Sequence, residues 1–421
     1  MLNDNIRILV ISNEAFSKGN SNGRTIMNLL SGVNKKNLAQ FYIHGVPDDN
    51  FCSADYHNSD SDALRAYFHL TKQKSIPNKC KSENKKKRFS VKRSSMNHVL
   101  RDLIWQSWSW WSDEFNIFLE NFRPNIVLLQ AGDAPFMYAL ALKIAKRYKA
   151  KLIMFNTEAY VLKRKIYSSV SIFNVWHMIL KYSLRHQYQK YMEQVSYCIY
   201  NTEALELAYQ KKYPHKGKSS TLYTSSDMPE LISRSSGPFS LLYCGNLGVG
   251  RDEVLNQVAE ILFKIDHTAC IDVYGKFNDH KSQQRLCANK NINYHGFIDY
   301  KKIPALMSKA SMLIHCEKDE RVDNLRFAFS TKIADCLSST CPFLVYASRE
   351  YPFVQYLQHN KCAHIASGKE ELELVLRKCI DDIAYRNKYR ESALIVSRKY
   401  HNFQNNVNRV NEIFTNVLYS L

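Results

Sequence analysis

The sequence lacks several features that would place the protein in a membrane or secreted class. No apolar run of about 18 residues occurs, so a membrane-spanning helix is not expected. The N-terminal segment Met1–Ser12 has a polar, acidic lead before a short apolar run, and a secretory signal peptide has a different layout. We therefore expect a cytoplasmic protein.

Cysteine motifs are also missing. The 11 cysteines are odd in number and scattered, and no two of them form a C-x-x-C pair, which gives a zinc ribbon or a thioredoxin-like site no support. Several lie inside apolar stretches. We expect reduced thiols that pack as small core residues, without a disulfide framework and without a metal site.

Nucleotide and nucleic-acid motifs are absent as well. The chain contains no G-x-x-x-x-G-K-[ST] loop and no G-x-G-x-x-G fingerprint, so neither a P-loop NTPase nor a simple dinucleotide-binding site is predicted. No helix-turn-helix, zinc-finger or RNP-like pattern occurs, so nucleic acid is not an expected partner. No D-x-D motif stands at the end of an expected strand.

The composition describes a globular chain with a surplus of positive charge. With 421 residues, 45% hydrophobic and 23% charged, the chain is long enough for two domains of about 200 residues each. The formal net charge of +19 indicates an anionic partner. Nucleic acid, acidic lipid or a phosphorylated substrate would each satisfy it, and charge alone does not choose among them.

The first half follows a strand–loop–helix pattern. The near-continuous apolar run Ile6–Ser12, a glycine-containing loop and a helix from Thr25 to Leu30 are typical of a parallel sheet. The polar region Asp48–Asn97 is predicted to be a long loop or disordered insert. The other expected elements of this half are the strands Ala39–His44, Ile126–Gln130, Lys151–Asn156 and Tyr197–Tyr200 and the helix Pro135–Lys149.

The alternation restarts after Thr224–Pro238, a Ser-, Pro- and Gly-rich segment that we expect to be a linker. The predicted fold is α/β, with two Rossmann-like doubly wound parallel sheets: an N-terminal domain 1–230, with a basic and aromatic insert at about 48–115, a C-terminal domain 239–398, and a helix 399–421 that packs back on the first domain. Expected strands are Ser240–Cys244, Ala269–Tyr274, Ile292–His295, Met312–Cys316, Phe343–Tyr346 and Ala363–Ile365; expected helices are Asp252–Ile265, Lys302–Lys309, Thr331–Ser338 and a long tail from Lys369 to about Leu418.

Two stretches of the second half have the chemistry of an anion site. In the strand-to-helix turn Cys244–Arg251, three glycines (Gly245, Gly248, Gly250) let the backbone approach a ligand, and Arg251 adds a forked cation. A glycine-rich turn with no ligand is the alternative.

The second stretch is F-S-T-K-I-A-D. Ser330 is placed to cap a helix that starts at Thr331, Lys332 adds positive charge at the helix start, and Asp335 lies one turn later on the same face. Together with Arg251, the residues suit a diphosphate. The alternative is a plain surface pair between Lys332 and Asp335.

These motifs, with G-F-I-D-Y-K-K-I-P-A-L-M (Gly296–Met307) between them and C-P-F-L-V-Y after them, resemble the C-terminal domain of GT-B glycosyltransferases. The similar subset builds bacterial capsule, exopolysaccharide and lipopolysaccharide and has a family 4-like C-terminal domain. The resemblance implies that the C-terminal domain holds a nucleotide-diphospho-sugar and the N-terminal domain an acceptor. It implies no cofactor beyond that donor, and a retaining reaction.

The resemblance also assigns roles. Arg251 and Lys332 would contact the diphosphate with help from Ser330 and Thr331, and Asp335 would bind ribose hydroxyls. Three departures stand out: Phe327 replaces a carboxylate that relatives often carry, Asp335 replaces a glutamate, and Thr340 replaces a glycine. The remaining implied contacts are Phe297 and Ile298 beside the base and Gly23 and Gly275 close to the donor.

Three carboxylates follow expected strands. Glu317 directly follows the expected strand Met312–Cys316 and is suited to bind donor-sugar hydroxyls. Asp133 and Glu158 follow N-terminal strands, where either could orient or deprotonate the acceptor hydroxyl. Solvated strand-end acids are the alternative. Because cations and helix ends can neutralise a leaving diphosphate, we expect the transfer to be metal-independent.

Basic and aromatic residues alternate in two segments of the first half. Lys85–Arg93 leads to the tryptophan-rich Leu103–Trp111, and Leu162–Tyr182 repeats the mixture. This combination suits an anionic membrane surface, so we expect peripheral docking on the inner face of the cytoplasmic membrane, where a lipid-linked acceptor would be presented. The alternative is that the tryptophans belong to the core.

The sequence therefore predicts a glycosyltransferase that moves a sugar from a nucleotide-diphospho-sugar to a glycan or lipid-linked glycan in surface polysaccharide synthesis. Two alternatives stay open. One is a nucleotide-sugar epimerase or hydrolase, and the other is a non-catalytic subunit of the same fold in a membrane glycan-assembly complex.

Overall fold

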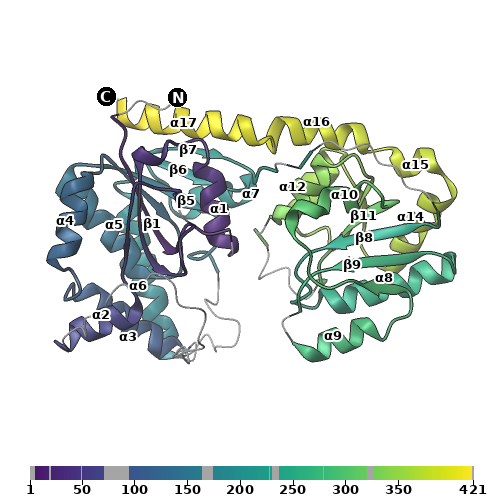
Figure 1. Cartoon of the computed structure of the whole chain (residues 1–421), viewed down its shortest axis with the longest axis horizontal. Helices are drawn as coiled ribbons and strands as arrows, with labels where there is room; N and C mark the ends of the chain where they lie inside the picture. Colours follow the sequence, from purple (N-terminus) through teal and green to yellow (C-terminus); the bar gives the residue numbers. More distant parts are fainter. Residues whose placement is uncertain are drawn as a thin grey trace. The chain divides into compact units, whose positions relative to one another are not determined.

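The computed structural model describes residues 5–18, 20–48, 50–70, 94–163, 174–226, 228–229, 237–277, 279–319, 326–327 and 329–419. The chain forms two compact units. Unit 1 comprises Met1–Thr221 together with Val407–Leu421, and unit 2 comprises Leu222–Asn406. The last helix therefore starts in unit 2 and continues into unit 1. Each unit is a parallel sheet with helices on both sides (Figure 1).

The sheet of unit 1 has seven strands in the order β3-β2-β1-β4-β5-β6-β7, and every neighbouring pair is parallel. The predicted boundaries of β4, β5 and β6 are confirmed, because these strands are short apolar runs buried on both faces. The strands are β1 (Ile8–Glu14), β2 (Leu38–His44), β3 (Ala54–His57), β4 (Ile126–Gln130), β5 (Lys151–Asn156), β6 (Tyr197–Tyr200) and β7 (Lys218–Thr221).

The helices of unit 1 connect these strands and cover the sheet. They are α1 (Ser21–Leu30), the 3₁₀ turn η1 (Lys35–Asn37), α2 (Asp60–Tyr67), α3 (Ser95–Gln106), α4 (Asp113–Phe122), α5 (Pro135–Tyr148), α6 (Val175–Met192), α7 (Glu203–Lys212) and most of α17 (Phe403–Tyr419).

Unit 2 has a six-stranded sheet in the order β10-β9-β8-β11-β12-β13, again parallel throughout. Its strands are β8 (Ser240–Cys244), β9 (Cys270–Tyr274), β10 (Ile292–Tyr294), β11 (Met312–Cys316), β12 (Phe343–Tyr346) and β13 (His364–Ala366). Its helices are α8 (Arg251–Ile265), α9 (His280–Cys287), η2 (Tyr300–Lys302), α10 (Ile303–Met307), α12 (Thr331–Ser338), α13 (Pro352–His359), α14 (Lys369–Asp381), α15 (Ile383–Asn387) and α16 (Arg390–Tyr400).

Both faces of the second sheet are buried. Along β8, Leu241 and Tyr243 belong to the core on one face and Leu242 to the core on the other. Alternate residues of a strand point to opposite faces, so a strand buried on both sides must be apolar at nearly every position. This is why the apolar runs predicted β8, β11 and β12 with the correct limits.

The prediction of one long helix from Lys369 to about Leu418 is wrong, because this stretch forms four helices, α14 to α17. Asp382 ends α14, and its side chain accepts a hydrogen bond from the Tyr385 backbone N–H to start α15. Asn402 does the same between α16 and α17 by accepting from the Asn405 N–H. Helix periodicity continues through such caps, so the pattern alone did not reveal the breaks.

The prediction of a structureless region from Asp48 to Asn97 is also wrong in part. Its first 20 residues contain β3 and α2, and α3 begins at Ser95. The basic run Lys85–Arg93 lies outside the described residues. β3 was missed because it is a short, polar edge strand with alternating exposure.

The tryptophan segment belongs largely to the core. Trp105 is fully buried and Trp110 nearly so, and Trp105 stacks on Phe136 with ring centroids 4.6 Å apart. Trp108 and Trp111 are half-buried under the Lys143 ammonium, which lies 4.3 Å and 4.8 Å from their ring centroids. The expectation that Leu103–Trp111 as a whole faces a membrane is therefore corrected for Trp105 and Trp110. Of the second segment, 164–173 lie outside the described residues.

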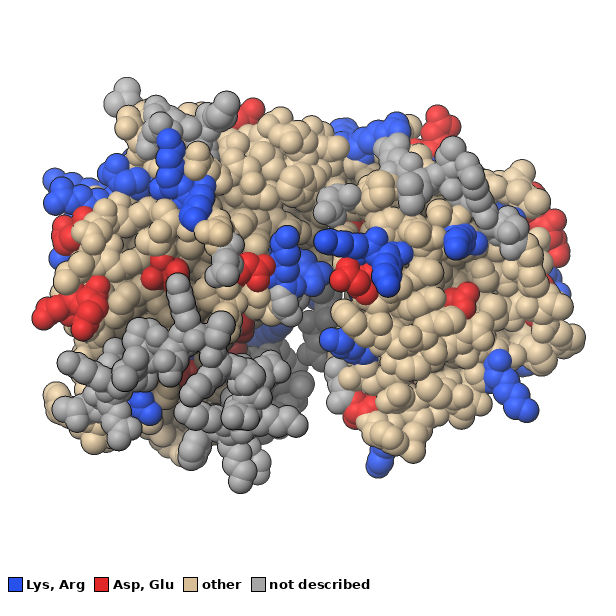
Figure 2. Space-filling view, viewed as in Figure 1, with Lys and Arg blue, Asp and Glu red and all other residues tan. Residues whose placement is uncertain are grey.

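The surplus charge is not gathered in one patch on the visible face. Figure 2 shows lysines and arginines at several places on both units, with fewer acidic groups among them. Within the described ranges, no helix combines the length and the apolar character needed to cross a membrane.

Candidate functional site

The strand order of unit 2 defines where a ligand site is expected. Connections run outward in one direction from β8 and in the other direction from β11, so the neighbouring strands β8 and β11 mark the switch point of the sheet. In open parallel sheets, ligands bind beyond the carboxyl ends of the strands at this point. β8 ends at Cys244 and leads into the glycine-rich turn, while β11 ends at Cys316 and leads to Glu317.

Arg251 and Glu317 form a buried ion pair between the two strand ends. The Arg251 Nε donates to Glu317 Oε1 at 3.1 Å, and Nη2 donates to the same oxygen. Their side chains are only 14% and 5% exposed, respectively. Burial opposes the charge on Arg251, but Tyr243 and Glu317 hold its pKa above the ordinary value. The predicted site residues Arg251 and Glu317 are thus brought together, although 66 residues separate them in sequence.

Lys332 lies beside this pair as a cation that forms no ion pair within the described parts of the chain. Its Nζ is 3.5 Å from the Tyr243 hydroxyl and 5.2 Å from that ring's centroid. Burial, reinforced by the nearby Arg251 charge and partly offset by Glu317, lowers the pKa of Lys332 to about 8. An anion bound here would raise the pKa of Lys332 toward its ordinary value by supplying a negative charge beside the amine.

The glycines of the turn make room for this arrangement. A Cβ on Gly245 would lie 1.8 Å from Lys332 Nζ, and a Cβ on Gly275 would lie 1.8 Å from the Gly245 carbonyl oxygen. Gly250 has φ +82°, a left-handed conformation that glycine adopts without strain, and it is the N-cap of α8. Gly245, Gly250 and Gly275 are therefore required by packing and backbone geometry. Gly248 donates its N–H to Asn246 Oδ1 at 2.6 Å.

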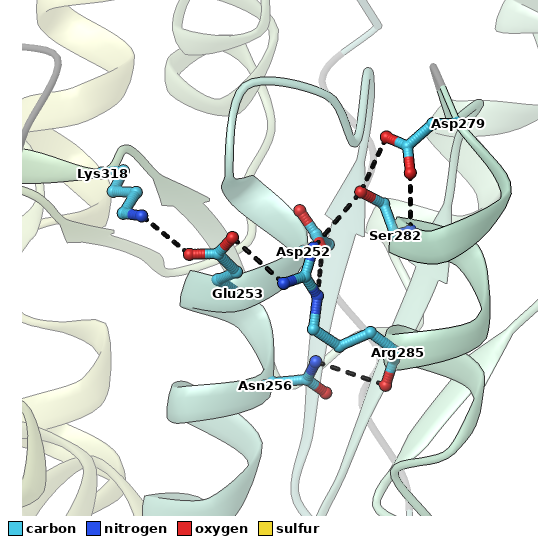
Figure 3. A network of polar contacts seen from close by, with 7 residues as sticks. All are labelled: Asp252, Glu253, Asn256, Asp279, Ser282, Arg285 and Lys318. Atoms are coloured by element: carbon cyan, nitrogen blue, oxygen red, sulfur yellow. Dashed lines mark hydrogen bonds and ion pairs between the residues drawn. The ribbon is translucent and has the colours of Figure 1, made fainter.

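Four further charged groups near the start of α8 neutralise one another. Arg285 pairs with the buried Asp252 at 2.8 Å and with Glu253 at 3.1 Å, and Lys318, the residue after Glu317, pairs with Glu253 at 2.8 Å (Figure 3). The network ties α8 to α9 and to the end of β11. Since the acids of the first turn of α8 have these cations as partners, their repulsion of an anion at this edge is reduced.

His315 is a site residue that the sequence analysis missed. It lies two positions before Glu317, only 2% exposed, and its Nε2 is 3.5 Å from Glu317 Oε1. Burial and then the Lys332 and Arg251 charges lower its pKa well below 6.5, so it is neutral. His315 Nε2 and Glu317 Oε2 are buried atoms without a hydrogen-bond partner among the described residues. The sequence contained one signal that could have identified His315, namely a polar residue inside the apolar run M-L-I-H-C.

The start of α12 differs from the prediction in one respect. Ser330 occupies the N-cap position, but its side chain makes no capping hydrogen bond; only its carbonyl accepts, from the Ile333 N–H at 3.0 Å. The expected side-chain cap is thus wrong, while Thr331 begins the helix as predicted. The first turn of α12 therefore lacks a side-chain acceptor from Ser330.

Asp335 does not pair with Lys332. Its Oδ1 accepts hydrogen bonds from the Ser226 hydroxyl at 2.7 Å and from the Tyr300 hydroxyl at 2.9 Å. The surface pair with Lys332 that the sequence left open is not formed. Ribose binding by Asp335 stays a prediction.

The residues predicted beside the base lie after β10. Gly296 has φ +78°, and its carbonyl accepts from the Gly275 N–H at 2.9 Å. Phe297 is 67% exposed, with Lys276 Nζ 4.0 Å from its ring centroid, and Ile298 is half-buried. An exposed aromatic ring at a loop tip is available for stacking. Phe327 is half-buried, with the Arg326 guanidinium 5.7 Å from its ring centroid.

The predicted residues of unit 1 lie at the carboxyl edge of its own sheet. A Cβ on Gly23 would lie 2.4 Å from the Ala15 carbonyl oxygen, so Gly23 packs the start of α1 against the loop after β1. Asp133 follows β4 and is half-buried. Glu158 follows β5 and pairs with Lys163 at 2.9 Å, at 45% exposure. Burial raises the pKa of the half-buried Tyr160, and the charges of Glu158 and Asp133 raise it further.

Unit 1 also contains a D-x-D sequence at this edge and a cavity at the opposite edge. Asp60–Asp62 follows the unpredicted β3, but Asp60 accepts from Arg101 and Trp105, and Asp62 forms a capping box with Ser59. Among the described residues, no group of His, Cys, Asp or Glu has a metal-binding arrangement. A cavity of about 390 Å³ lies at the amino ends of β5, β6 and β7, against α17.

No protein-family model and no curated protein sequence matches the chain. Solved structures do match over nearly the whole length. Sucrose-phosphate synthase from Thermosynechococcus elongatus has a TM-score of 0.65 at 9% identity, covering 99% of this chain and 100% of its own. HepE from Anabaena, solved with UDP and glucose, has a TM-score of 0.62 at 11% identity with the same coverage.

A glycosyltransferase from Rickettsia africae has a TM-score of 0.61 at 13% identity, again covering 99% of this chain and 100% of its own. At identities this low, the structural similarity establishes a shared fold alone. The two parallel sheets of seven and six strands, each doubly wound, agree with these neighbours. The chain therefore has the GT-B fold that the sequence predicted.

Proposed function

We propose that the protein transfers a glycosyl group from a nucleotide-diphospho-sugar to a hydroxyl of a glycan or lipid-linked glycan. The observation that carries the proposal is Lys332, a buried cation beside Arg251 at the switch point of unit 2, which pairs with no carboxylate among the described residues. Within the described part of this site, Arg251 and Lys332 face the carboxylate of Glu317, so a bound diphosphate would balance their charge.

The fold supports the same reading. HepE was solved with UDP and glucose on this fold, and a trehalose-6-phosphate protein of E. coli was solved with UDP-2-fluoro-glucose. This similarity supports a nucleotide-sugar donor, and the cations of unit 2 supply the groups that would bind its diphosphate.

In the proposed reaction, the bond between the sugar's anomeric carbon and the diphosphate oxygen breaks, and the acceptor oxygen bonds to that carbon while losing its proton. The leaving diphosphate gains negative charge, which Arg251, Lys332 and the N-terminal N–H groups of α12 would stabilise. This charge set supports metal-independent transfer. Glu317 Oε2 and His315 Nε2 are available to bind donor-sugar hydroxyls. Retention of configuration, and Asp133 or Glu158 as the group that accepts the proton, remain proposals from the family resemblance.

The acceptor part of the proposal is a growing surface polysaccharide, lipid-linked and presented at the inner face of the cytoplasmic membrane. The surplus of positive charge over the chain supports an anionic surface as a partner. No cofactor other than the donor is proposed.

Donor transfer is tested by incubating the protein with UDP-, GDP- and dTDP-sugars and measuring nucleoside diphosphate release with and without lipid-linked acceptor extract. Acceptor-dependent release supports the proposal. Release with water alone would support a hydrolase, and conversion of the donor sugar without release would support an epimerase.

A non-catalytic subunit is the second candidate, and one observation favours it. Phe327 stands where similar enzymes often have a carboxylate, and its neighbour in space is Arg326. Donor binding with no turnover of any donor in the presence of acceptor extract would support this reading over the enzyme.

A further inference from the structure

Exposed apolar side chains are concentrated on three helices of unit 1. Among the described residues, 21 large apolar side chains are exposed, and 12 of them lie on or directly after α2, α3 and α6. Six of these form what we term the apolar face: Met96, Leu100 and Leu103 of α3, and Trp176, Ile179 and Tyr182 of α6. Single exposed apolar residues are ordinary, but a contiguous group marks an interaction surface.

The two helices of this face run side by side in the same direction. Ser183 of α6 donates to Asp102 of α3 at 2.8 Å, and one turn later Gln187 donates to Gln106 at 3.4 Å. Because both contacts advance by four residues on each helix, the helices are parallel, and Ile179 lies at the height of His98, between Met96 and Leu100. α2 packs on α3 through Asp60, which accepts from Arg101 and Trp105 (Figure 1).

The inner sides of these helices already account for the fold. α3 buries Val99 and Trp105, and α6 buries Leu180, Leu184 and Tyr188, with the three- and four-residue spacing of a core-facing stripe. The outer residues Leu103 and Tyr182 are 61% and 72% exposed, respectively, and add nothing to that core. The first two turns of α6 are thus apolar on both sides, which a soluble surface helix does not need.

Charge indicates what covers the face. Between positions 71 and 93, the sequence that joins α2 to α3 has ten lysines and arginines and one glutamate. The acids of the helices themselves are engaged within the unit: Asp60 with Arg101, Asp62 in its capping box, and Asp102 with Gln106 and Ser183. A strongly basic segment therefore joins α2 to α3, which carry exposed leucines, and α3 lies beside α6, which carries the exposed Trp176 and Ile179.

We propose that the apolar face docks on a bilayer that contains anionic phospholipids, with its apolar side chains in the interface. Trp176 and Tyr182 have the apolar body and polar tip that suit the headgroup region, and the surplus of positive charge in the sequence between α2 and α3 complements an anionic surface. The inference rests on the proposed function in one respect: a lipid-linked acceptor explains why the protein would bind a membrane. The docking surface is formed by α3 and α6 and excludes the largely buried Trp105 and Trp110.

Vesicle flotation of the full chain tests this surface without donor or acceptor. Wild-type protein is expected to float with phosphatidylglycerol-containing vesicles at low salt, and the double variant Leu103→Glu, Ile179→Glu to bind at least tenfold more weakly. Leu207→Glu is the matched control, because Leu207 is 60% exposed in the same unit but lies on α7, away from the face. Circular dichroism and nucleotide-sugar binding confirm that each variant is folded, so that a failed docking surface and a failed donor site give different results.

Three outcomes would overturn the proposal. The first is no wild-type binding at low salt, and the second is equal binding by the double variant, which would leave only non-specific charge attraction. The third is a concentration-dependent wild-type dimer that the double variant abolishes, measured by light scattering, with no vesicle binding, because the face would then join two copies of the chain. The difference between the fluorescence spectra of wild type and Trp176→Phe isolates the emission of Trp176. A blue shift of this emission when vesicles are added would support interfacial insertion.

Discussion

The two units carry the same sheet with different chemistry at its carboxyl edge. Both sheets place their first strand beside their fourth. In unit 2, this edge holds Arg251, Lys332 and Glu317. In unit 1, the comparable edge holds amides beside the acids Asp133 and Glu158: Asn13, Asn156 and Asn201 each have a buried side-chain polar atom without a hydrogen-bond partner among the described residues. Cations suit an anionic donor, and amides suit neutral hydroxyls such as those of a sugar acceptor.

The ion pairs of the two edges differ in the same way. Arg251–Glu317 is 14% and 5% exposed, whereas Lys163–Glu158 is 26% and 45% exposed. Breaking a buried pair leaves an uncompensated charge, so Glu317→Ala is expected to lower the free energy of unfolding by about 3–5 kcal/mol. Glu158→Ala should cost about 0–1 kcal/mol, since water screens the exposed pair. Urea unfolding of the full chain measures both, and equal effects would contradict the assigned difference.

Removing Lys332 is the next largest expected effect. Lys332→Ala should remove about 2–4 kcal/mol of transition-state stabilisation, which lowers kcat/KM by a factor of about 30–1,000. The reason is that the amine would contact the charge that develops on the diphosphate. The free energy of unfolding should stay constant or rise, since burial disfavours this cation. Lys301→Ala, on η2, is the control and should keep wild-type turnover. Near-wild-type kcat/KM in Lys332→Ala would refute the role.

The pH dependence of donor binding follows from the same residue. The pKa of Lys332 in the free protein is lowered to about 8, so the amine loses its proton as pH rises through 8. Binding of an anion needs the charged amine, so affinity for a nucleoside diphosphate should fall by up to about tenfold per pH unit above 8. Lys332→Arg, which stays protonated, should flatten the profile. A flat wild-type profile between pH 7 and 10 would contradict the contact.

The same lysine also makes folding depend on pH. Between pH 8 and the ordinary lysine pKa, the unfolded chain binds more protons than the folded one, so the contribution of Lys332 to the free energy of unfolding should rise with pH across this window. Below pH 8 both states are protonated and the contribution is constant. Comparing urea midpoints of wild type and Lys332→Met at pH 7.5 and 10 isolates it, and an unchanged difference would count against the lowered pKa.

The smallest expected effect comes from the glycine under the lysine. A Cβ at position 245 would lie 1.8 Å from Lys332 Nζ, and a lysine chain can move aside. Gly245→Ala should therefore displace the amine and weaken donor binding by about tenfold. Because Gly245 has φ +158°, a conformation that L side chains rarely adopt, the substitution should also lower the free energy of unfolding by about 1 kcal/mol. Isothermal titration calorimetry measures the affinity. Unchanged affinity would show that the amine reaches the ligand from another position.

Local sequence patterns predicted much of the fold. The limits of β11, β12 and α12 were correct because fully apolar runs and helix-start residues are local signals. The missed strands β3 and β7 are short and polar, and the false long helix after Lys369 contained caps at Asp382 and Asn402. These features depend on side-chain hydrogen bonds that hydrophobic periodicity does not record.

The site was predicted as a set of residue types but not as a set of contacts. Glycines and cations at the ends of helices and strands correctly indicated that Arg251 and Lys332 lie near each other at the carboxyl edge of the unit 2 sheet. The Arg251–Glu317 pair spans 66 residues, and the contacts of Asp335 with Ser226 and Tyr300 span 109 and 35 residues, respectively. Only the folded sheet brings such groups together, so sequence could not show that Asp335 is already engaged.

We expect the carboxyl edge of unit 2 to bind the diphosphate of a nucleotide-sugar. Isothermal titration calorimetry with UDP-, GDP- and dTDP-sugars, and with a CMP-sugar as the monophosphate comparison, tests it most directly. We expect saturable binding of at least one diphospho-sugar, weaker binding of the CMP-sugar, and at least a tenfold loss of affinity in both Arg251→Ala and Lys332→Ala. Binding that survives both substitutions unchanged, or no binding of any diphospho-sugar, would contradict it.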